Sequence, residues 1–148
     1  MRALLQRVQS ASVSVGGETV GEIGRGILIF LGVAAGDGPG DADFLADKCT
    51  RLRIFTDGED KMNLSVRDVK GAVLSISQFT LAADTAKGLR PSFSSAMEPQ
   101  AAEELYERFN AKLRASGVPF AAGRFGADMQ VKLINDGPVT FLLESSGR

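Results

Sequence analysis

The chain has 148 residues, of which 44% are hydrophobic and 24% are charged, and its formal net charge at pH 7 is -1. The length predicts one domain over residues 1–148, and the composition excludes a disordered chain. The nearly balanced charge excludes a protein that grips long nucleic acid through many phosphates, so no DNA partner is expected and an RNA partner would be held locally.

The first third of the chain predicts β-structure. Residues 1–7 end in a charged arginine, which indicates a first strand rather than a signal peptide. Residues 11–23 alternate apolar with polar side chains and turn at Gly16-Gly17, a pattern typical of a hairpin. The apolar run 27–33 favours a strand buried on both faces, and it is too short to span a bilayer, which needs about 20 residues. We therefore expect a cytoplasmic protein with no membrane contact.

A helix is predicted over residues 41–52, where the spacing of apolar residues changes. Leu45, Cys49 and Leu52 fall on one face of that helix. Cys49 is the only cysteine, so it is assigned to the core and fits a reducing compartment.

The remainder of the chain continues in the same mixed pattern. Four segments predict strands by apolar runs or alternation: 54–56, 72–77, 129–133 and 139–143. Residues 82–95 lack periodicity and predict one long ordered loop, which in a compact domain is more often functional than idle. Pro99 opens a second helix, and Gly117 ends it. These elements predict an α+β domain with mainly antiparallel sheet and two principal helices.

The chain contains no histidine, and its one cysteine has no neighbouring cysteine. A Ser-His-Asp triad, a Cys-His pair and a zinc site of the usual ligands are therefore excluded. We expect no metal and no cofactor. Any catalytic reaction must therefore use a proton acceptor other than histidine or a paired cysteine.

The segment Ser77-Gln78-Phe79-Thr80-Leu81 lies where a buried strand runs out into the long loop. Backbone N–H groups that lose their ladder partners at such a place can face a ligand, and they suit an oxyanion. The simpler interpretation is a strand end with ordinary polar caps. Thr80 is also a candidate nucleophile, but no histidine and no lysine close in sequence is present to activate it.

Two further motifs leave alternatives open. Gly137-Pro138 stands between two predicted strands and must turn or bulge, because proline cannot donate to a β-ladder. The dipeptide is either a plain β-turn or a cis peptide bond, and only about 5–6% of X-Pro bonds are cis. In the long loop, Lys87 and Arg90 form either a clasp for a phosphate or ribose, or ordinary solvated charge.

Together, Ser-Gln-Phe-Thr-Leu at 77–81 and Asn-Asp-Gly-Pro-Val-Thr at 135–140 resemble the two signature motifs of the D-aminoacyl-tRNA deacylase family. The resemblance spans nearly the whole chain in order, with no departure inside either motif. It also covers residues 6–8, 11–13, 61–64, 87–93 and 125–129.

The resemblance implies a barrel-like deacylase fold and a homodimer in which each subunit completes the other's site. It places Ser77, Gln78, Phe79 and Thr80 around the 3'-terminal aminoacyl-adenosine, as the catalytic group. Gly137-Pro138, cis in the family, would enter from the opposite subunit and reject L-amino acids. Three residues are assigned to substrate binding by the same resemblance: Met129, Lys87 and Arg90.

The implied activity is hydrolysis of the ester bond of D-aminoacyl-tRNA, a chiral proofreading step in translation quality control. An L side chain would collide with the Gly-Pro backbone, whereas glycine would not, so glycyl-tRNA mischarged on tRNA(Ala) is an expected second substrate. The family is thought to use the 2'-hydroxyl of the terminal ribose rather than a protein nucleophile. Two alternatives remain: a Thr80-dependent esterase, and a non-catalytic module that binds the tRNA acceptor end.

Overall fold

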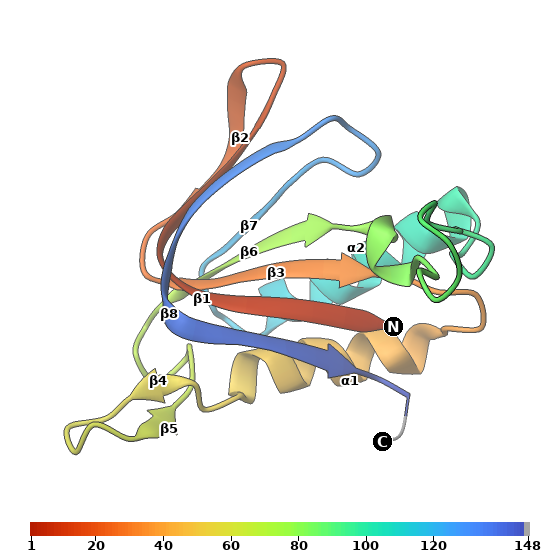
Figure 1. Ribbon diagram of the computed structural model, residues 1–148. Coiled ribbons are helices and arrows are strands. Elements are labelled where there is room, and N and C mark those ends of the chain that lie inside the picture. The colour runs from red at the N-terminus through yellow and green to blue at the C-terminus, as the bar shows by residue number, and fades with distance from the viewer. Residues whose placement is uncertain (147–148) are drawn as a thin grey trace.

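The fold is a strongly curved six-stranded sheet with two helices packed on one face, seen in a computed structural model that describes residues 1–146 (Figure 1). Residues 147 and 148 of the predicted domain lie outside the described part. Neighbouring strands pair in the order β2-β1-β3-β6-β7, and β8 pairs with the other edge of β1 along almost its whole length, from Arg2 to Ser14. The strands are β1 (Arg2–Val15), β2 (Glu18–Ile23), β3 (Gly26–Gly32), β6 (Ala72–Ser77), β7 (Phe120–Ala122) and β8 (Gln130–Glu144).

Most of the strand pairing is antiparallel, as predicted, but the sheet is mixed because two of its pairs are parallel. β1 pairs antiparallel with β2, β3 and β8, whereas β3 with β6 and β6 with β7 are parallel. The connection from β3 to β6 contains α1, and the connection from β6 to β7 contains α2. Each connection carries the chain back to the end of the sheet where the previous strand began, so the next strand runs parallel to it. At the open side, an added Cβ on Gly21 of β2 would stand 2.8 Å from the Ala122 carbonyl oxygen of β7, so the two end strands nearly close a barrel. The predicted barrel-like α+β fold is thus confirmed.

Both predicted helices are present, and each begins at a proline. The helix α1 (Pro39–Arg51) starts two residues before the predicted segment, because proline fits the first helical position. The helix α2 (Pro99–Ala115) is capped by Glu98, whose carboxylate accepts hydrogen bonds from two backbone N–H groups of the first turn. Cys49 is buried as predicted, and burial raises the pKa of its thiol to about 12.

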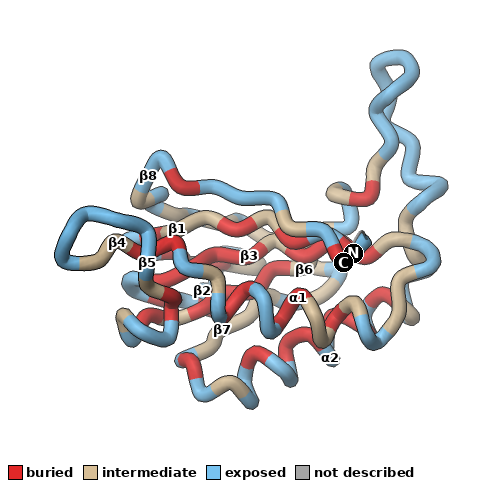
Figure 2. The backbone as a smooth tube through the Cα atoms, turned by 90° about the horizontal axis from the view of Figure 1, so that it is seen from below, coloured by how far each residue is buried: buried red, intermediate tan, exposed pale blue. Residues whose placement is uncertain are grey.

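The core has two layers, one on each face of the sheet. Between the sheet and the helices, Ile27 and Ile29 of β3 pack with residues of α1 and α2 such as Leu45 and Phe109. Inside the curve of the sheet, Leu28 packs in a second cluster. β3 is therefore buried on both faces, as its continuous apolar run predicted, and Figure 2 shows buried residues concentrated along the central strands.

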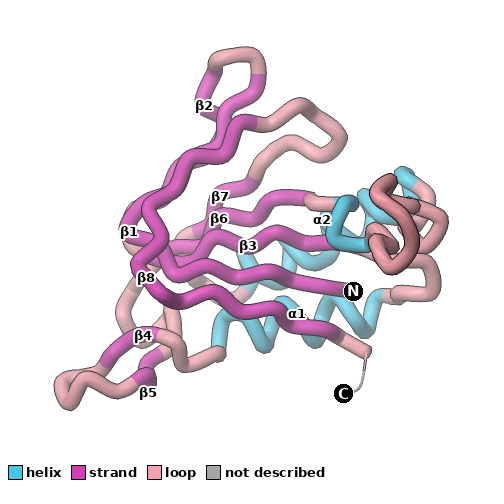
Figure 3. Tube along the Cα trace, viewed as in Figure 1, coloured by secondary structure: helices cyan, strands magenta, loops and turns pink. Residues whose placement is uncertain are grey.

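The remaining elements are short (Figure 3). β4 (Phe55–Thr56) and β5 (Met62–Leu64) form a small separate hairpin, and η1 (Phe79–Ala82) is a single 3-10 turn after β6. The strands β5 and β7 were not predicted, since three residues are too few for a periodic pattern. Within the described residues, no helix is both long and apolar enough to cross a membrane.

The parallel pairing of β3 with β6 depends on Gly26, and a substitution there tests it. A Cβ at this position would collide with the backbone of Ala72, its partner in β6. Because overpacking typically costs about 1–3 kcal/mol and this obstacle is rigid backbone, Gly26→Ala should lower the free energy of unfolding by about 3 kcal/mol. Urea unfolding measures this change in the free energy of unfolding. Gly24→Ala, where no atom lies within 4 Å, is the matched control, and equal midpoints for both variants would contradict this account.

Candidate functional site

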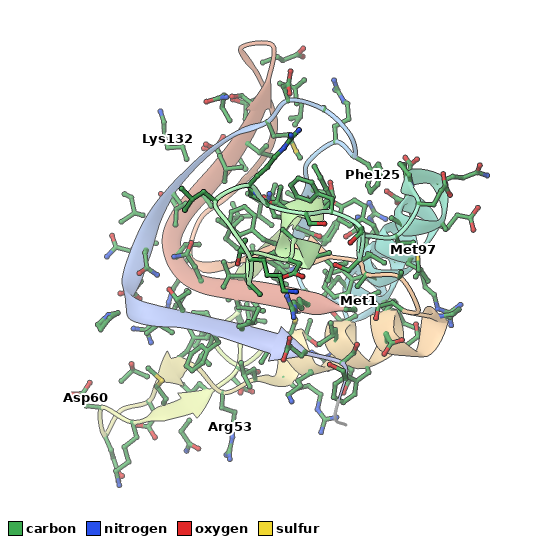
Figure 4. All side chains as sticks on the ribbon, turned by 45° about the vertical axis from the view of Figure 1, so that its right-hand side comes forward. Met1, Arg53, Asp60, Met97, Phe125 and Lys132 are labelled. Atoms are coloured by element: carbon green, nitrogen blue, oxygen red, sulfur yellow. The ribbon has the colours of Figure 1, made fainter. Side chains whose placement is uncertain are left out.

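A cavity of about 480 Å³ opens at the carboxyl end of β6. The first turn of α2 and the loop before β8 form its other walls. Its lining is mainly apolar, and the larger side chains are Ile76, Met97, Phe125, Met129 and Val131. Figure 4 shows Met97 and Phe125 on the same side of the molecule, beside α2.

Backbone donors become available where β6 ends beside this cavity. The N–H of Gln78 still donates to the Leu31 carbonyl at 2.8 Å, and η1 then turns the chain away from the sheet. In a 3-10 turn the first N–H groups have no acceptor within the turn, and here these groups belong to Phe79 and Thr80. The sequence motif therefore sits at a strand end whose next two N–H groups are left for a ligand or water.

Four predicted site residues line the cavity: Ser77, Gln78, Phe79 and Met129. Thr80 is not in the lining, but its hydroxyl accepts a 2.5 Å hydrogen bond from the Gln78 side-chain amide. Phe79 is 61% exposed, and its ring packs 5.2 Å from that of Phe93, which reaches back from the long loop. An apolar side chain this exposed beside a cavity is a typical contact for a bound ligand.

The structure does not bring Lys87 and Arg90 to the cavity. Both are exposed in the loop after η1, and neither belongs to the lining. The loop is closed on itself by paired backbone hydrogen bonds between Asp84 and Ser92, so its tip projects away. A role for these two cations in substrate binding stays a prediction.

Gly137-Pro138 lies in a bulge of β8, at the other end of the sheet from the cavity. Gln6 pairs with Thr140 and Val8 pairs with Asn135, so residues 136–139 stand opposite a single residue of β1. The Gly137-Pro138 bond is cis, and both residues are exposed. The sequence left a plain turn between two strands or a cis bond open; β8 is one strand with a cis bond in its bulge.

Two side chains hold this bulge in place. Arg7 forms a 3.1 Å ion pair with the Asp136 carboxylate, and its guanidinium also donates to the carbonyls of Asp136 at 3.1 Å and Ile54 at 2.7 Å. The Asn135 amide donates to the carbonyls of Arg7 at 2.9 Å and Val139 at 3.2 Å. The Gly-Pro backbone is therefore firmly supported although it contributes nothing to the cavity of its own chain.

β8 exposes large apolar side chains on both sides of this bulge. Ile134 is 55% exposed, Phe141 36% and Leu142 53%. Large exposed side chains gathered along one strand mark a surface for another protein. Figure 2 shows how much of β8 is exposed compared with its neighbour β1.

Sequence reasoning missed the part of the cavity that comes from α2. Met97, Pro99 and Ala102 line it, yet Pro99 signalled only a helix start and the other two carried no motif. Nothing local could have placed them beside β6. Among the described residues, no cluster of carboxylate, thiol or imidazole side chains is arranged to hold a metal ion.

Comparison with known proteins gives consistent matches over nearly the whole chain. The family model described as D-Tyr-tRNA(Tyr) deacylase matches residues 4–144. A D-aminoacyl-tRNA deacylase of Pelobacter propionicus is 59% identical over 144 residues, covering 97% of this chain and 99% of the relative.

Two solved structures also match. One described as a c-Myc DNA unwinding element binding protein has a TM-score of 0.91 and 42% identity, covering 97% of this chain and 98% of its own. Another, described as a probable eukaryotic D-amino acid tRNA deacylase, has a TM-score of 0.79 at 17% identity over 97% and 98% of the two chains, and it supports the fold alone.

Proposed function

The chain belongs to the D-Tyr-tRNA(Tyr) deacylase family, and on that premise we propose that it hydrolyses the ester bond between a D-amino acid and the terminal adenosine of tRNA. Its relatives named D-aminoacyl-tRNA deacylase are hydrolases, and the chain matches them from end to end. The observation that carries the proposal is the cavity at the end of β6, where two unpaired backbone donors adjoin an apolar wall. We place the activity in the cytoplasm, where it removes mischarged tRNA from translation.

The cavity suits an aminoacylated adenosine. Pockets for small molecules usually measure about 300–1,000 Å³ and combine apolar walls with a few polar groups, and this one measures about 480 Å³. Phe125, Met97 and Met129 offer polarizable surface to a flat base. Ser77 and Gln78 supply polar groups at the end where the ester would lie.

The chemistry we propose needs no protein nucleophile. Water attacks the ester carbonyl, the N–H groups of Phe79 and Thr80 stabilise the resulting oxyanion, and the bond to the ribose 3'-oxygen then breaks as that oxygen takes up a proton. The neighbouring 2'-hydroxyl relays the proton, which fits a chain without histidine. Positioning of this kind is worth up to about 7–11 kcal/mol of the barrier. Gln78, which lines the cavity beside Ser77, orients the ester.

Selection against L-amino acids comes from Gly137-Pro138 of a second subunit. On its own chain the turn is exposed, firmly held and remote from the cavity, which suits a part that acts in another subunit's site. A fixed backbone at the α-carbon excludes an L side chain but leaves room for a D side chain or for none. Glycyl-tRNA, including glycine mischarged on tRNA(Ala), is therefore a second substrate.

The subunits pair through the exposed apolar residues of β8, which are Ile134, Phe141 and Leu142. Closed two-fold dimers are the most common oligomers, and such an interface uses the same patch twice. Ile134 and Leu142 flank the Gly-Pro bulge on both sides, so an interface there carries the turn to the partner. The homodimer is thus the active unit.

Release of amino acid from D-tyrosyl-tRNA and L-tyrosyl-tRNA at nanomolar enzyme tests the activity and the chiral filter together. We expect turnover of the D substrate alone. Pro138→Ala should raise hydrolysis of the L substrate at least about tenfold, because a lost steric clash worth about 1.4 kcal/mol changes the rate by that factor. Pro39→Ala, at an exposed helix start, is the control. Tight binding without turnover would favour a non-catalytic acceptor-end module.

The proposed mechanism predicts that Thr80 is dispensable and the substrate hydroxyl is not. Thr80→Ala removes only an exposed acceptor for Gln78, so it should retain most of kcat. A tRNA ending in 2'-deoxyadenosine should lose about 100-fold or more in kcat, as removal of an acid–base group does. Single-turnover kinetics measures both. Loss of activity in Thr80→Ala with unchanged substrate affinity, or hydrolysis of simple amino-acid esters at equal rate, would point instead to a Thr80-dependent esterase.

The dimer is tested with a charge placed in the apolar patch. Leu142→Asp should weaken dimerisation at least tenfold, because a carboxylate would be buried without a partner, and activity should fall in parallel. Sedimentation equilibrium follows the mass from the 15.6 kDa subunit upward. Leu89→Asp is the matched control, since Leu89 is fully exposed on the long loop. A wild-type chain that remains monomeric would refute completion of the site in trans.

A further inference from the structure

A basic groove lies at the end of the sheet opposite the cavity. Two hollows of about 610 and 220 Å³ share Arg67. The last turns of α1 and the turn after β5 line the larger one, and Lys70 and the end of α2 line the smaller one. We define the basic groove by its five cationic residues, Lys48, Arg51, Arg53, Arg67 and Lys70.

The groove carries a local positive charge in a chain whose net charge is -1. Only two carboxylates line it, and both are already engaged. Asp47 pairs with Arg51 at 3.0 Å. The Asp68 carboxylate accepts the Ser65 backbone N–H at 2.7 Å, and this hydrogen bond, with a smaller contribution from Arg53, lowers the pKa of Asp68. An anion in the groove would therefore meet an excess of cations.

Some of these cations have roles in the fold, and two remain for a ligand. Arg51 and Lys48 stand in the last turn of α1, where they complement the helix dipole, and Arg67 donates to the Thr50 hydroxyl at 2.7 Å. Arg53 and Lys70, by contrast, form no ion pair within the described residues. Arg53 donates a 2.8 Å hydrogen bond to the Asn63 amide oxygen, which is an uncharged partner.

The guanidinium of Arg7 links the segment after Arg53 to the Gly-Pro bulge. Arg7 donates to the carbonyl of Ile54, the residue after Arg53, and also holds Asp136 beside Gly137. In Figure 1, the end of α1, the hairpin β4-β5 and the bend of β8 lie together, whereas η1 and the start of α2 lie at the other end. The basic groove and the bulge therefore lie at the same end of the subunit, so an interface that brings the bulge to the partner also brings the groove there.

We propose that the basic groove binds backbone phosphates of the tRNA acceptor stem whose aminoacylated end occupies the partner subunit's cavity. The inference rests on the proposed function, in which the bulge enters that cavity. When the bulge is there, the groove lies beside the cavity mouth, where the nucleotides behind the terminal adenosine emerge. Arginine and lysine side chains hold phosphates through charge-assisted hydrogen bonds without reading the sequence, which suits an enzyme that acts on many tRNAs.

Binding of uncharged tRNA, titrated by fluorescence anisotropy over a series of salt concentrations, tests the groove without reference to catalysis. Arg53→Gln/Lys70→Gln should weaken binding at least tenfold at low salt. It should also reduce the slope of log affinity against log salt by about 1.5, since each lost phosphate contact contributes roughly 0.7–0.9. The control with the same charge change is Arg108→Gln/Lys112→Gln on α2, which lies outside the groove and outside the proposed β8 interface.

Kinetics on two substrates gives the second readout. The groove variant should raise KM for D-aminoacyl-tRNA at least tenfold with kcat retained, and it should leave hydrolysis of D-aminoacyl-adenosine, which has no stem, unchanged. Arg53→Lys should keep the wild-type salt slope, which separates lost charge from lost folding. Wild-type tRNA affinity in the groove variant, or an equal loss in the control, overturns the inference.

Failure of the proposed function is a distinct outcome. It would appear as a wild-type chain that releases no amino acid from either substrate, whatever its tRNA affinity. Inorganic phosphate serves as a competitor. We expect it to displace tRNA only at concentrations high enough to act through ionic strength. Saturable competition by micromolar phosphate would show a small-anion site and would contradict a tRNA surface.

Discussion

The pairing of β1 on both of its edges is the constraint on which the rest of the structure depends. Its first half is held between β3 and β8, and its second half between β2 and β8. Because one long strand belongs to both halves, it must bend, and its bend gives the sheet the curvature that encloses the inner core cluster. The register of β1 with β8 also makes residues 136–139 a bulge, since they stand opposite Arg7 alone, and it leaves Gly137 and Pro138 exposed.

This arrangement separates the two parts of the site that we propose. The cavity and its backbone donors lie where β6 ends, and the supported Gly-Pro bulge lies at the other end of the sheet. A rigid part that is exposed and remote on its own chain becomes useful only in a second copy. In the proposed dimer, association would do more than add stability, because it would assemble the pocket, the Gly-Pro bulge and the basic groove around one tRNA end.

The proposed chemistry depends on few side chains. A chain without histidine has no ordinary general base near neutral pH, so rate enhancement must come from oriented donors and a positioned substrate. In the proposed mechanism, backbone N–H groups at the end of β6 serve this purpose, because their direction is set by the strand and by η1. Under the proposed mechanism, recognition by backbone and by steric exclusion would let one site accept many D side chains.

The sequence by itself determined the features that depend on neighbours along the chain. The alternation in residues 11–23, the apolar run 27–33, the two helices, the second with its proline start, and the position of 77–81 at a strand end could all be predicted from residue type and spacing. Periodicity reports which face of an element is apolar, and proline and glycine report local backbone geometry. The family motifs added the expected roles, which no local pattern contains.

Only the tertiary structure decided what lies beside what. The parallel pairing of β3 with β6, the entry of Met97 and Ala102 into the cavity, and the position of Lys87 outside it depend on contacts between distant segments. Such contacts follow from the curvature of the sheet and the path of the crossovers, and the short strand β7 exists only because β6 offers it a free edge. The sequence named the Gly-Pro turn; the register of β8 against β1 decided that it faces away from its own cavity.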